Sequence, residues 1–239
     1  TQEESASPRG RIALMKHAAD TGFIDEEFVE FMDACIQCRG CETACPAGVE
    51  FGSMMETTRE ALATQTSYQR WWRRLGYRTL GWPNFLAFGS RVLSVLQLIR
   101  VLPKKLGLPQ IPLVQRKLLS SGNDVFLFTG CIMDAWMRET HRAVQRVVEA
   151  TGNGVQFPSK AAACCGALHV HAGLGDEARR LAKRTMAAFP GEAPILVDSA
   201  GCGAQLKSYG HLLETKEAKQ FAERVLDVHE WLADHINEL

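Results

Sequence analysis

Four cysteines lie close together near the amino terminus of this 239-residue chain. Cys35, Cys38, Cys41 and Cys45 follow the spacing C-x2-C-x2-C-x3-C, and Pro46 comes directly after the last of them. The short intervals allow each Sγ to turn toward the same side of a tight loop, so the thiols can share one bound group. Pro46 keeps a local helix from continuing. The segment therefore predicts a loop that binds metal.

This spacing is that of the bacterial ferredoxin motif, in which cysteine thiolates hold an iron–sulfur cluster. Gly40 is expected to supply the backbone freedom that lets the loop curl around inorganic sulfide. The alternative is a structural zinc site, which also uses thiolates but usually separates two ligand pairs by a longer spacer. Because all four thiols lie on one loop, we predict that Cys35, Cys38, Cys41 and Cys45 bind a 4Fe-4S cluster.

Composition narrows the class of protein. The 27 Lys and Arg residues equal the 27 Asp and Glu residues, so the formal net charge is zero and a nucleic-acid partner is not expected. No signal-peptide pattern follows Thr1, and no apolar run reaches the roughly 18 residues of a membrane-spanning helix. Eight cysteines in such a chain are expected to serve metal or redox chemistry in the cytoplasm rather than a disulfide framework.

Hydrophobic periodicity predicts helices over residues 12–20, 25–32 and 50–62, on both sides of the cysteine loop. Residues 1–64 are therefore predicted to form a small α-helical, ferredoxin-like module that holds one cluster. A thiolate-bound cluster carries negative charge, so Arg39 within the loop can tune its potential. The commoner outcome for such an arginine is simple solvation.

The middle of the chain is basic and apolar. From residue 61 to residue 123 it contains no Asp or Glu, while aromatic and aliphatic side chains alternate with bases. One interpretation is a docking surface for an acidic partner subunit or for the anionic inner face of the cell membrane. The other is a helical linker, residues 65–123, whose apolar stripe packs on its own protein. The bases are Arg70, Arg73, Arg74, Arg78, Arg91, Arg100, Lys104, Lys105, Arg116 and Lys117.

Residues 124–239 alternate short apolar runs with amphipathic helices. Strands are predicted over 125–128, 155–158 and 194–198, and helices over 134–151, 178–189, 204–213, 217–224 and 228–237. Such alternation is typical of an α/β layer with a mostly parallel sheet. The predicted fold is therefore multidomain, α+β overall: a helical ferredoxin module, a helical linker and an α/β domain.

The other four cysteines follow the predicted strands. Cys131 and Cys202 come just after the first and third strands, and Cys164 and Cys165 lie in the loop after the second. Ligands bind at the carboxyl edge of open α/β sheets, so the four thiols are expected to converge in one crevice and to bind a second cluster. The alternatives are buried cysteines that act as small apolar residues, and a strained disulfide between Cys164 and Cys165.

Several stretches of this half resemble the cysteine-rich CCG domain of the heterodisulfide reductase B family. They are Gly130-Cys131, Cys164-Cys165-Gly166-Ala167-Leu168-His169, Ser199-Ala200-Gly201-Cys202-Gly203-Ala204 and Lys207-Ser208-Tyr209-Gly210. Together with Ser7-Pro8-Arg9-Gly10-Arg11-Ile12 and the first cysteine loop, they resemble the iron–sulfur subunits of glycolate oxidases (glycolate dehydrogenases). This resemblance implies a non-catalytic subunit that relays electrons from a flavin-containing 2-hydroxy acid dehydrogenase subunit toward a membrane acceptor.

The chain departs from that family in the number of its motifs and domains and in one residue of the CCG pattern. Family members carry two ferredoxin motifs and two CCG domains, whereas this chain has one of each, so we expect a piece of a longer protein. In two-cluster ferredoxins the fourth cysteine of each motif ligates the other cluster, and Cys45 can serve either one. Gln205 stands where the CCG pattern often has a last cysteine. His169 or His171 can complete that site as nitrogen ligands, although surface exposure is the commoner outcome for histidine.

Three functions are compatible with these motifs. The first is an electron-transfer subunit with 4Fe-4S clusters. The second is a heterodisulfide reductase-like thiol/disulfide enzyme that uses the crevice of Cys131, Cys164, Cys165 and Cys202, and the absence of a thiol at Gln205 makes it less favoured. The third is a zinc-stabilised interaction protein. Nucleotide-binding and serine-hydrolase motifs such as GxGxxG and GxSxG do not occur.

Overall fold

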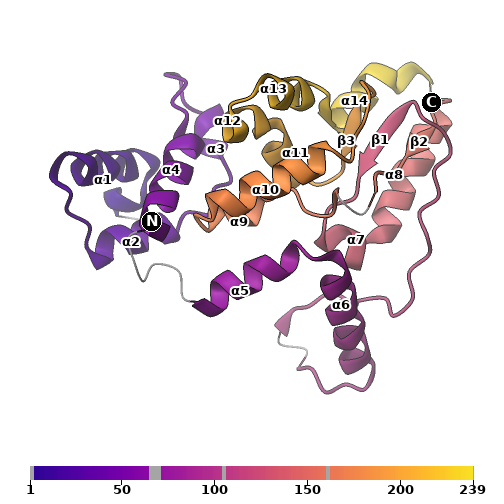
Figure 1. The fold of residues 1–239 in the computed structure, drawn as a ribbon, viewed down its shortest axis with the longest axis horizontal. Coiled ribbons are helices and arrows are strands. Elements are labelled where there is room, and N and C mark those ends of the chain that lie inside the picture. The colour runs from indigo at the N-terminus through magenta and orange to yellow at the C-terminus, as the bar shows by residue number, and fades with distance from the viewer. Residues whose placement is uncertain (1–2, 65–70, 104–105, 160–161, 239) are drawn as a thin grey trace. The chain divides into compact units, whose positions relative to one another are not determined.

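The computed structural model describes residues 3–64, 71–103, 106–159 and 162–238. The chain divides into two compact units, which Figure 1 shows in ribbon form. The first unit comprises residues 1–74 and 168–176, and the second comprises residues 75–167 and 177–239. Residues 168–176 hold most of α9 (Ala167–His171) and the first two residues of α10 (Gly175–Met186).

The regular structure that is described in the first unit is helical. Its amino-terminal elements are η1 (Glu4–Ala6), α1 (Pro8–Thr21), α2 (Glu26–Asp33), α3 (Gly40–Thr43) and α4 (Phe51–Thr64). One apolar core joins α1, α2 and α4 through Met15, Phe28, Met32, Phe51, Met55 and Leu62. The three predicted helices are present, each within a few residues of the expected bounds.

The start of α1 explains the sequence Ser7-Pro8-Arg9-Gly10-Arg11. The Ser7 hydroxyl accepts a hydrogen bond from the Gly10 N–H at 3.0 Å, which caps the helix, and Pro8 occupies its first turn. A Cβ on Gly10 would lie 2.0 Å from the Glu4 carbonyl oxygen, so only glycine fits. Arg11 is buried and donates to the carbonyl oxygens of Ala6 and Phe31.

The second unit contains a four-stranded sheet in the order β2-β1-β3-β4. The strands are β1 (Val125–Phe128), β2 (Val155–Gln156), β3 (Ile195–Val197) and β4 (Val225–Asp227), and each neighbouring pair is parallel. The predicted fold class, with an α/β domain built on a parallel sheet, is confirmed. The fourth strand was not predicted, because its three residues lie between two helical patterns.

Side chains of the sheet alternate between two apolar cores. Phe126 and Phe128 pack with Ile195, Phe189 and Tyr209, while Val125 and Leu127 pack with Leu196, Val148 and Trp231 on the other face. Burial on both faces is the usual condition of a parallel sheet, because crossover helices cover it on each side. The helices of this unit are α5 (Trp71–Leu80, mostly), α6 (Pro83–Leu98), α7 (Ile132–Trp136), α8 (Arg138–Ala150), α10, α11 (Ala200–Lys207), α12 (Tyr209–Leu213), α13 (Lys216–Glu223), α14 (Val228–His235) and η4 (Ile236–Glu238).

The predicted helix over 134–151 is divided in two. α7 begins at Ile132, and the helical conformation is interrupted at Met137 before α8 begins. Asp134, the first residue of the predicted helix, lies inside α7 and forms a bidentate pair with Arg138 at 2.6 and 2.9 Å. An acid and a base four residues apart are typical of a continuous helix, so the interruption between α7 and α8 was not predicted.

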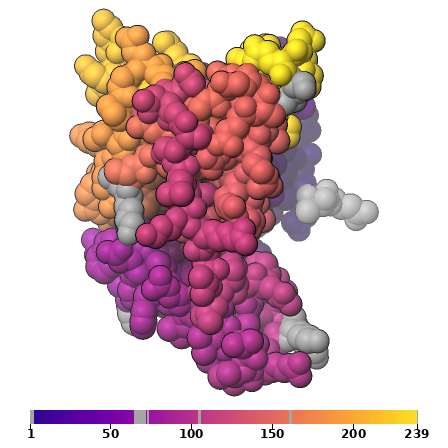
Figure 2. All heavy atoms as spheres, turned by 90° about the vertical axis from the view of Figure 1, so that its right-hand side faces the viewer, coloured from indigo at the N-terminus to yellow at the C-terminus, as the bar shows by residue number. Residues whose placement is uncertain are grey.

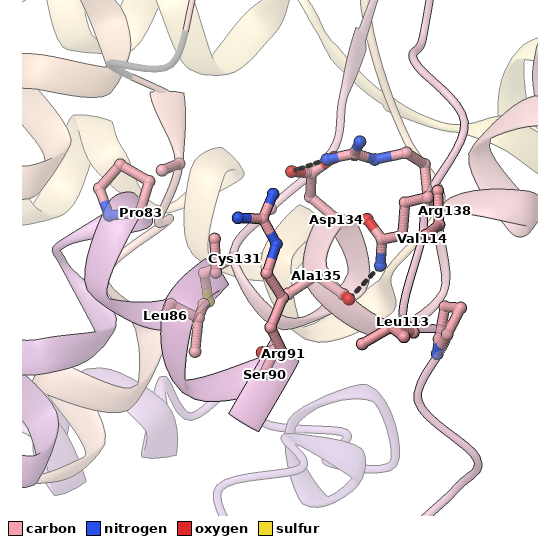
Figure 3. A pocket seen from close by; sticks show the side chains of 15 residues that line it. Pro83, Leu86, Ser90, Arg91, Leu113, Val114, Cys131, Asp134, Ala135 and Arg138 are labelled. Atoms are coloured by element: carbon pink, nitrogen blue, oxygen red, sulfur yellow. Dashed lines mark hydrogen bonds and ion pairs between the residues drawn. The ribbon is translucent and has the colours of Figure 1, made fainter. Parts of the chain in front are cut away.

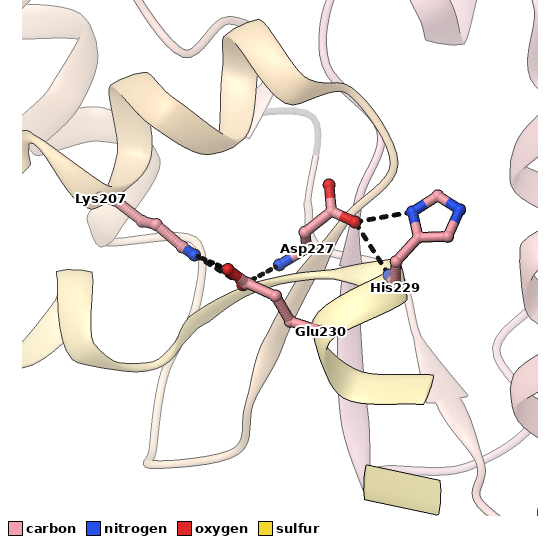
Figure 4. Close-up of polar contacts among 4 residues, drawn as sticks. All are labelled: Lys207, Asp227, His229 and Glu230. Atoms are coloured by element: carbon pink, nitrogen blue, oxygen red, sulfur yellow. Dashed lines mark hydrogen bonds and ion pairs between the residues drawn. The ribbon is translucent and has the colours of Figure 1, made fainter. Parts of the chain in front are cut away.

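A polar cluster fixes α14 at the end of β4 (Figure 4). The Asp227 carboxylate accepts from the His229 N–H at 2.8 Å, and the Glu230 carboxylate accepts from the Asp227 N–H at 2.8 Å. This reciprocal arrangement is a capping box. Lys207 of α11 donates to both Glu230 oxygens, at 2.8 and 2.6 Å, and lowers the pKa of that carboxyl.

None of the helices that the structure describes is both long and apolar enough to cross a lipid bilayer.

Candidate iron–sulfur sites

The first cysteine loop runs between α2 and α4. Cys35 and Cys41 are half-buried against the apolar core of the first unit, whereas Cys38 is exposed. Backbone freedom is used at Gln37 and Arg39, which have φ of 52° and 57°, and not at Gly40, which begins α3. The prediction that Gly40 supplies the turn was therefore wrong. Left-handed backbone at non-glycine residues costs about 1 kcal/mol or more each and needs support from neighbours.

One face of α4 provides that support. Gly52, Glu56 and Arg59 are spaced four and three residues apart, so they lie on the same side of the helix. The Gly52 N–H donates to the Glu42 carboxylate at 2.5 Å. A Cβ on Gly52 would lie 2.7 Å from Arg39 Nε, so a side chain here would push the Arg39 and Glu42 side chains away from the helix. The loop is thus held by hydrogen bonds to a rigid helix.

Arg39 forms an ion pair within this contact. Its guanidinium lies 2.6 Å from a Glu56 carboxylate oxygen, and both side chains are largely buried. The expectation of simple solvation for Arg39 was wrong, because α4 places an acid directly opposite it. Whether Arg39 tunes a bound cluster stays a prediction.

Arg59 of α4 also donates hydrogen bonds to the loop. Its guanidinium reaches the carbonyl oxygens of Met32 at 2.5 Å and Cys35 at 2.6 Å, and the Gln37 side-chain oxygen at 3.2 Å. Sequence reasoning missed Arg59 and Glu56. A usable signal was present: both charged residues occur on the helical face that continues from the buried Phe51 and Gly52.

The thiols of the loop differ in their surroundings. Burial raises the pKa of Cys41, and the charges of Glu42, Cys35 and Cys38 raise it further, so three thiols of the motif interact. Backbone N–H groups of Val49 and Ala47 instead lower the pKa of Cys45. Cys45 lines a hollow of about 580 Å³ with Cys41, Ser7 and Arg9. Whether Cys45 serves the local cluster or a second one stays a prediction.

The residues of this loop fit an iron–sulfur cluster. The buried Gln37 amide nitrogen, between Cys35 and Cys38 in sequence, has no hydrogen-bond partner among the described residues. An orphaned buried N–H donor in the same loop as four thiols suits thiolate or sulfide acceptors. No three His, Cys, Asp or Glu side chains in the described ranges are grouped as ligands of a single metal ion. A cubane binds its thiolates through separate iron atoms and so holds them farther apart.

The second set of thiols converges at the carboxyl edge of the sheet. Cys165 Sγ lies 3.4 Å from Cys202 Sγ, and the Cys164 thiol hydrogen-bonds to Cys131. Gly130 turns the chain after β1 with a left-handed φ of 67°, a conformation that favours glycine, and it lies close to Cys202. The expected convergence is therefore present, because parallel strands deliver their following loops to one edge.

These contacts divide the four thiols into two pairs. The Cys164 hydrogen bond lowers the pKa of Cys131 to about 7, and the Cys165 hydrogen bond lowers the pKa of Cys202. The same hydrogen bonds, together with burial, raise the pKa of Cys164 and of Cys165. Each pair thus has one sulfur suited to negative charge and one that stays protonated without a bound cation. All eight cysteines carry free thiols, so the vicinal Cys164–Cys165 disulfide is not formed.

A cavity of about 340 Å³ opens beside Cys131. α6 contributes Leu86, Ser90 and Arg91 to its wall, and Figure 3 shows the Arg91 side chain extending between Cys131 and Asp134. The Ser90 hydroxyl is fixed by a hydrogen bond from Trp136 at 2.9 Å. A small molecule can therefore reach one thiol of the second set, whereas Cys164 and Cys165 are buried.

The two histidines and Gln205 that the sequence analysis considered at the second site are all at least partly buried. His169 is 1% exposed and His171 is half-buried, so the expectation of surface histidines was wrong. Both group with the first unit, where the His171 carbonyl oxygen accepts a hydrogen bond from Arg59 at 2.8 Å. Gln205 is also buried, and its amide nitrogen has no partner among the described residues. Like Gln37, it places a spare N–H donor close in sequence to thiols.

Known protein families match both cysteine sets. Residues 28–49 match a 4Fe-4S binding domain, and residues 125–207 match a cysteine-rich domain named CCG. The first loop therefore lies in a 4Fe-4S binding domain, and the prediction of a 4Fe-4S cluster in this chain is confirmed at the level of the domain. No solved structure matches the chain.

Two curated proteins are similar over nearly the whole chain. A probable glycolate oxidase iron–sulfur subunit of Bacillus subtilis is 34% identical over 93% of this chain and 57% of its own length. The glycolate oxidase iron–sulfur subunit of Escherichia coli is 28% identical over 97% of this chain and 60% of its own length. Lactate utilization protein A of Geobacillus kaustophilus is 31% identical over 46% of this chain and 48% of its own. The chain thus spans about three fifths of the first two relatives.

The pKa of His171 predicts acid sensitivity in the first unit. Burial, and then the charges of Arg59 and Arg39, lower its pKa to about 4, while the unfolded chain binds the proton near its ordinary value of about 6.5. The resulting stability is present above about pH 6.5 and is lost as pH falls toward 4. In urea titrations, lowering the pH from 7 to 5 should cost the wild type about 1 kcal/mol more than His171→Gln. Exposed His17 supplies the control: His17→Gln should keep the wild-type sensitivity, and an equal pH response in all three proteins would contradict the assignment.

Proposed function

Because this chain is a relative of the glycolate oxidase iron–sulfur subunits, with a 4Fe-4S binding domain and a cysteine-rich domain, we propose that it transfers electrons within an oxidoreductase complex. A flavin-containing subunit oxidises a 2-hydroxy acid such as glycolate, and this chain relays the electrons toward an acceptor at the membrane. The observation that carries the proposal is the cysteine loop held in place by α4. When bound, a 4Fe-4S cluster takes up and releases single electrons.

The proposed ligands are the four thiols of the first loop. The charges of Cys35 and Cys38 raise the pKa of Cys41, and backbone N–H groups lower the pKa of Cys45 and so favour its thiolate. α4 fixes the loop through Gly52, Glu56 and Arg59, so little rearrangement is needed for a cluster to bind. A preorganised site of this kind also limits structural change between oxidation states, which favours electron transfer.

A second cluster in the cysteine-rich domain is part of the proposal. Its ligands would be Cys131, Cys164, Cys165 and Cys202, which the sheet edge brings together. Metal binding would deprotonate the two buried thiols that otherwise stay neutral, and the iron would supply the missing counter-charge. The spare amide N–H of Gln205 suits a hydrogen bond to sulfur in such a site.

Thiol/disulfide chemistry is the second candidate, and two observations favour it. The pKa of Cys131 is lowered to about 7, and this thiol borders a cavity that a small disulfide can enter. Thiolate character and access are the conditions for exchange. Gln205 stands against it, because the position that resembles a last cysteine of the pattern carries no thiol. Reduction of a small disulfide by the purified chain would favour this candidate over simple electron transfer.

Contact with an anionic membrane surface is also proposed, through α6 and the segment that follows it. Phe85, Phe88 and Leu98 are 53%, 66% and 73% exposed, and Val101 and Val114 are exposed beyond them. Figure 2 shows this segment in purple and magenta, gathered in one lobe. Residues 61–123 carry bases and no acid. Exposed aromatic and aliphatic side chains in a segment that contains bases and no acid fit the interface of a bilayer with anionic headgroups.

Substitution of one loop cysteine tests the electron-transfer proposal. Cys38→Ser should remove the paramagnetic signal of the reduced ferredoxin-type cluster from anaerobically prepared protein, while far-ultraviolet circular dichroism shows a folded second unit. Cys202→Ser is the matched control and should keep that signal, since it alters only the second set. With cubane clusters, about eight irons per wild-type chain would indicate that both sets bind clusters, and about four that one does. An unchanged signal in Cys38→Ser would refute the loop assignment.

Vesicle binding tests the membrane contact. The protein should co-sediment with phosphatidylglycerol vesicles and not with phosphatidylcholine vesicles, and binding should weaken when salt is raised from 0.05 to about 0.5 M because charges are screened. Phe85→Ser with Phe88→Ser should reduce binding roughly tenfold or more through lost apolar burial. Phe23→Ser, at a residue 60% exposed outside this segment, should bind as the wild type does. If no vesicle binds, the surface belongs to a protein contact instead.

A further inference from the structure

Arg59 is a buried cation that has no acidic partner among the residues that the structure describes. Its residue is 4% exposed, and its guanidinium donates to five oxygen acceptors. Four are backbone carbonyls and one is an amide, so none carries a formal charge. They are Met32 O, Asp33 O, Cys35 O, Gln37 Oε1 and His171 O.

A charge in such surroundings is costly. Burial of an ion costs several kcal/mol in proteins even after relaxation, and buried charges are usually paired or bound to metal. Arginine remains protonated in proteins, so it cannot escape this cost by losing its proton. In the described parts of the chain, no carboxylate lies within ion-pair distance of Arg59. The carbonyl dipoles satisfy its hydrogen bonds but leave its net charge uncompensated.

The placement of its acceptors shows where a counter-charge would lie. Cys35 O belongs to the first cysteine of the loop, and Gln37 lies between the first and second. By accepting from Arg59, the Gln37 side-chain oxygen turns the orphaned amide nitrogen of the same side chain away from the guanidinium. Arg59 therefore acts on the loop in two ways, through a backbone carbonyl and through the orientation of a spare N–H donor.

We propose that the counter-charge of Arg59 is the 4Fe-4S cluster bound by this loop, and that Arg59 is a positioning residue that raises the cluster's reduction potential. The proposal rests on the assignment of the loop as the cluster site. A thiolate-bound cluster is negative and becomes more negative when it gains an electron. A buried cation nearby stabilises the reduced form more than the oxidised form, since charges interact strongly where water is excluded.

Arg39 shows why this role falls to Arg59. Arg39 belongs to the loop itself, but it lies 2.6 Å from the Glu56 carboxylate, so the pair is close to neutral. Its effect on a bound cluster is correspondingly reduced. No acid in the described part of the chain neutralises Arg59 in this way, and Arg59 is the more deeply buried of the two.

Redox titration of variants tests the proposal, with the electron paramagnetic resonance of the reduced cluster as the signal. Arg59→Gln removes the charge and should shift the midpoint potential to more negative values. Arg59→Lys keeps the charge and should restore iron content and a potential close to that of the wild type, although an ammonium has three donors for five acceptors. Arg11→Gln is the matched control, because Arg11 is also buried and also bound to carbonyl oxygens, which lie outside the cysteine motif. It should leave the potential unchanged.

Each outcome decides the proposal. Arg59→Gln protein that holds its cluster at the wild-type potential would overturn it and leave Arg59 a purely structural residue. If Arg59→Gln loses the cluster, the Arg59→Lys variant decides between two explanations. Recovered iron content in Arg59→Lys supports a requirement for the positive charge. Equal loss of iron overturns the proposal and shows that only the hydrogen bonds of the guanidinium are needed. Wild-type protein without any cluster would instead refute the proposed function, so the two failures are distinguishable.

Discussion

The contact between one face of α4 and the cysteine loop is the interaction on which the first unit depends. Gly52 leaves room for the Arg39 and Glu42 side chains, Glu56 neutralises Arg39, and Arg59 fixes the carbonyl of Cys35. The loop needs this support because Gln37 and Arg39 adopt left-handed backbone without the tolerance of glycine. A single helix, α4, thus supplies the packing, the hydrogen bonds and the charges that hold the loop. The positions of the thiols are fixed as a result.

The second unit reaches a similar result by topology. Its parallel strands send three following loops to one edge, where four thiols meet in two hydrogen-bonded pairs. In the first unit the ligands are neighbours in sequence and are aligned by a helix. In the second they are distant in sequence and are aligned by a sheet. Both arrangements place a buried glutamine N–H donor near the sulfurs in sequence, at Gln37 and at Gln205.

The features that depend on residues close together in the chain were predicted from the sequence. The spacing from Cys35 to Cys45 predicted the 4Fe-4S domain, and strand–helix alternation predicted the parallel sheet and the convergence of Cys131, Cys165 and Cys202. It failed where a partner is set by tertiary contacts. Arg39 was expected to be solvated because Glu56, far along the chain, gave no local sign of pairing with it. The buried state of His169 and the role of Arg59 were hidden for the same reason.

Mössbauer spectroscopy of anaerobically prepared, iron-57-enriched protein tests the central claim most directly, because it reports the chemical state of every bound iron. The account predicts iron in sulfide-bridged, mixed-valence sites with tetrahedral sulfur coordination, present in the wild type and diminished when the first cysteine loop is disrupted. Well-folded protein that contains zinc in place of iron, or no metal at all, would contradict it.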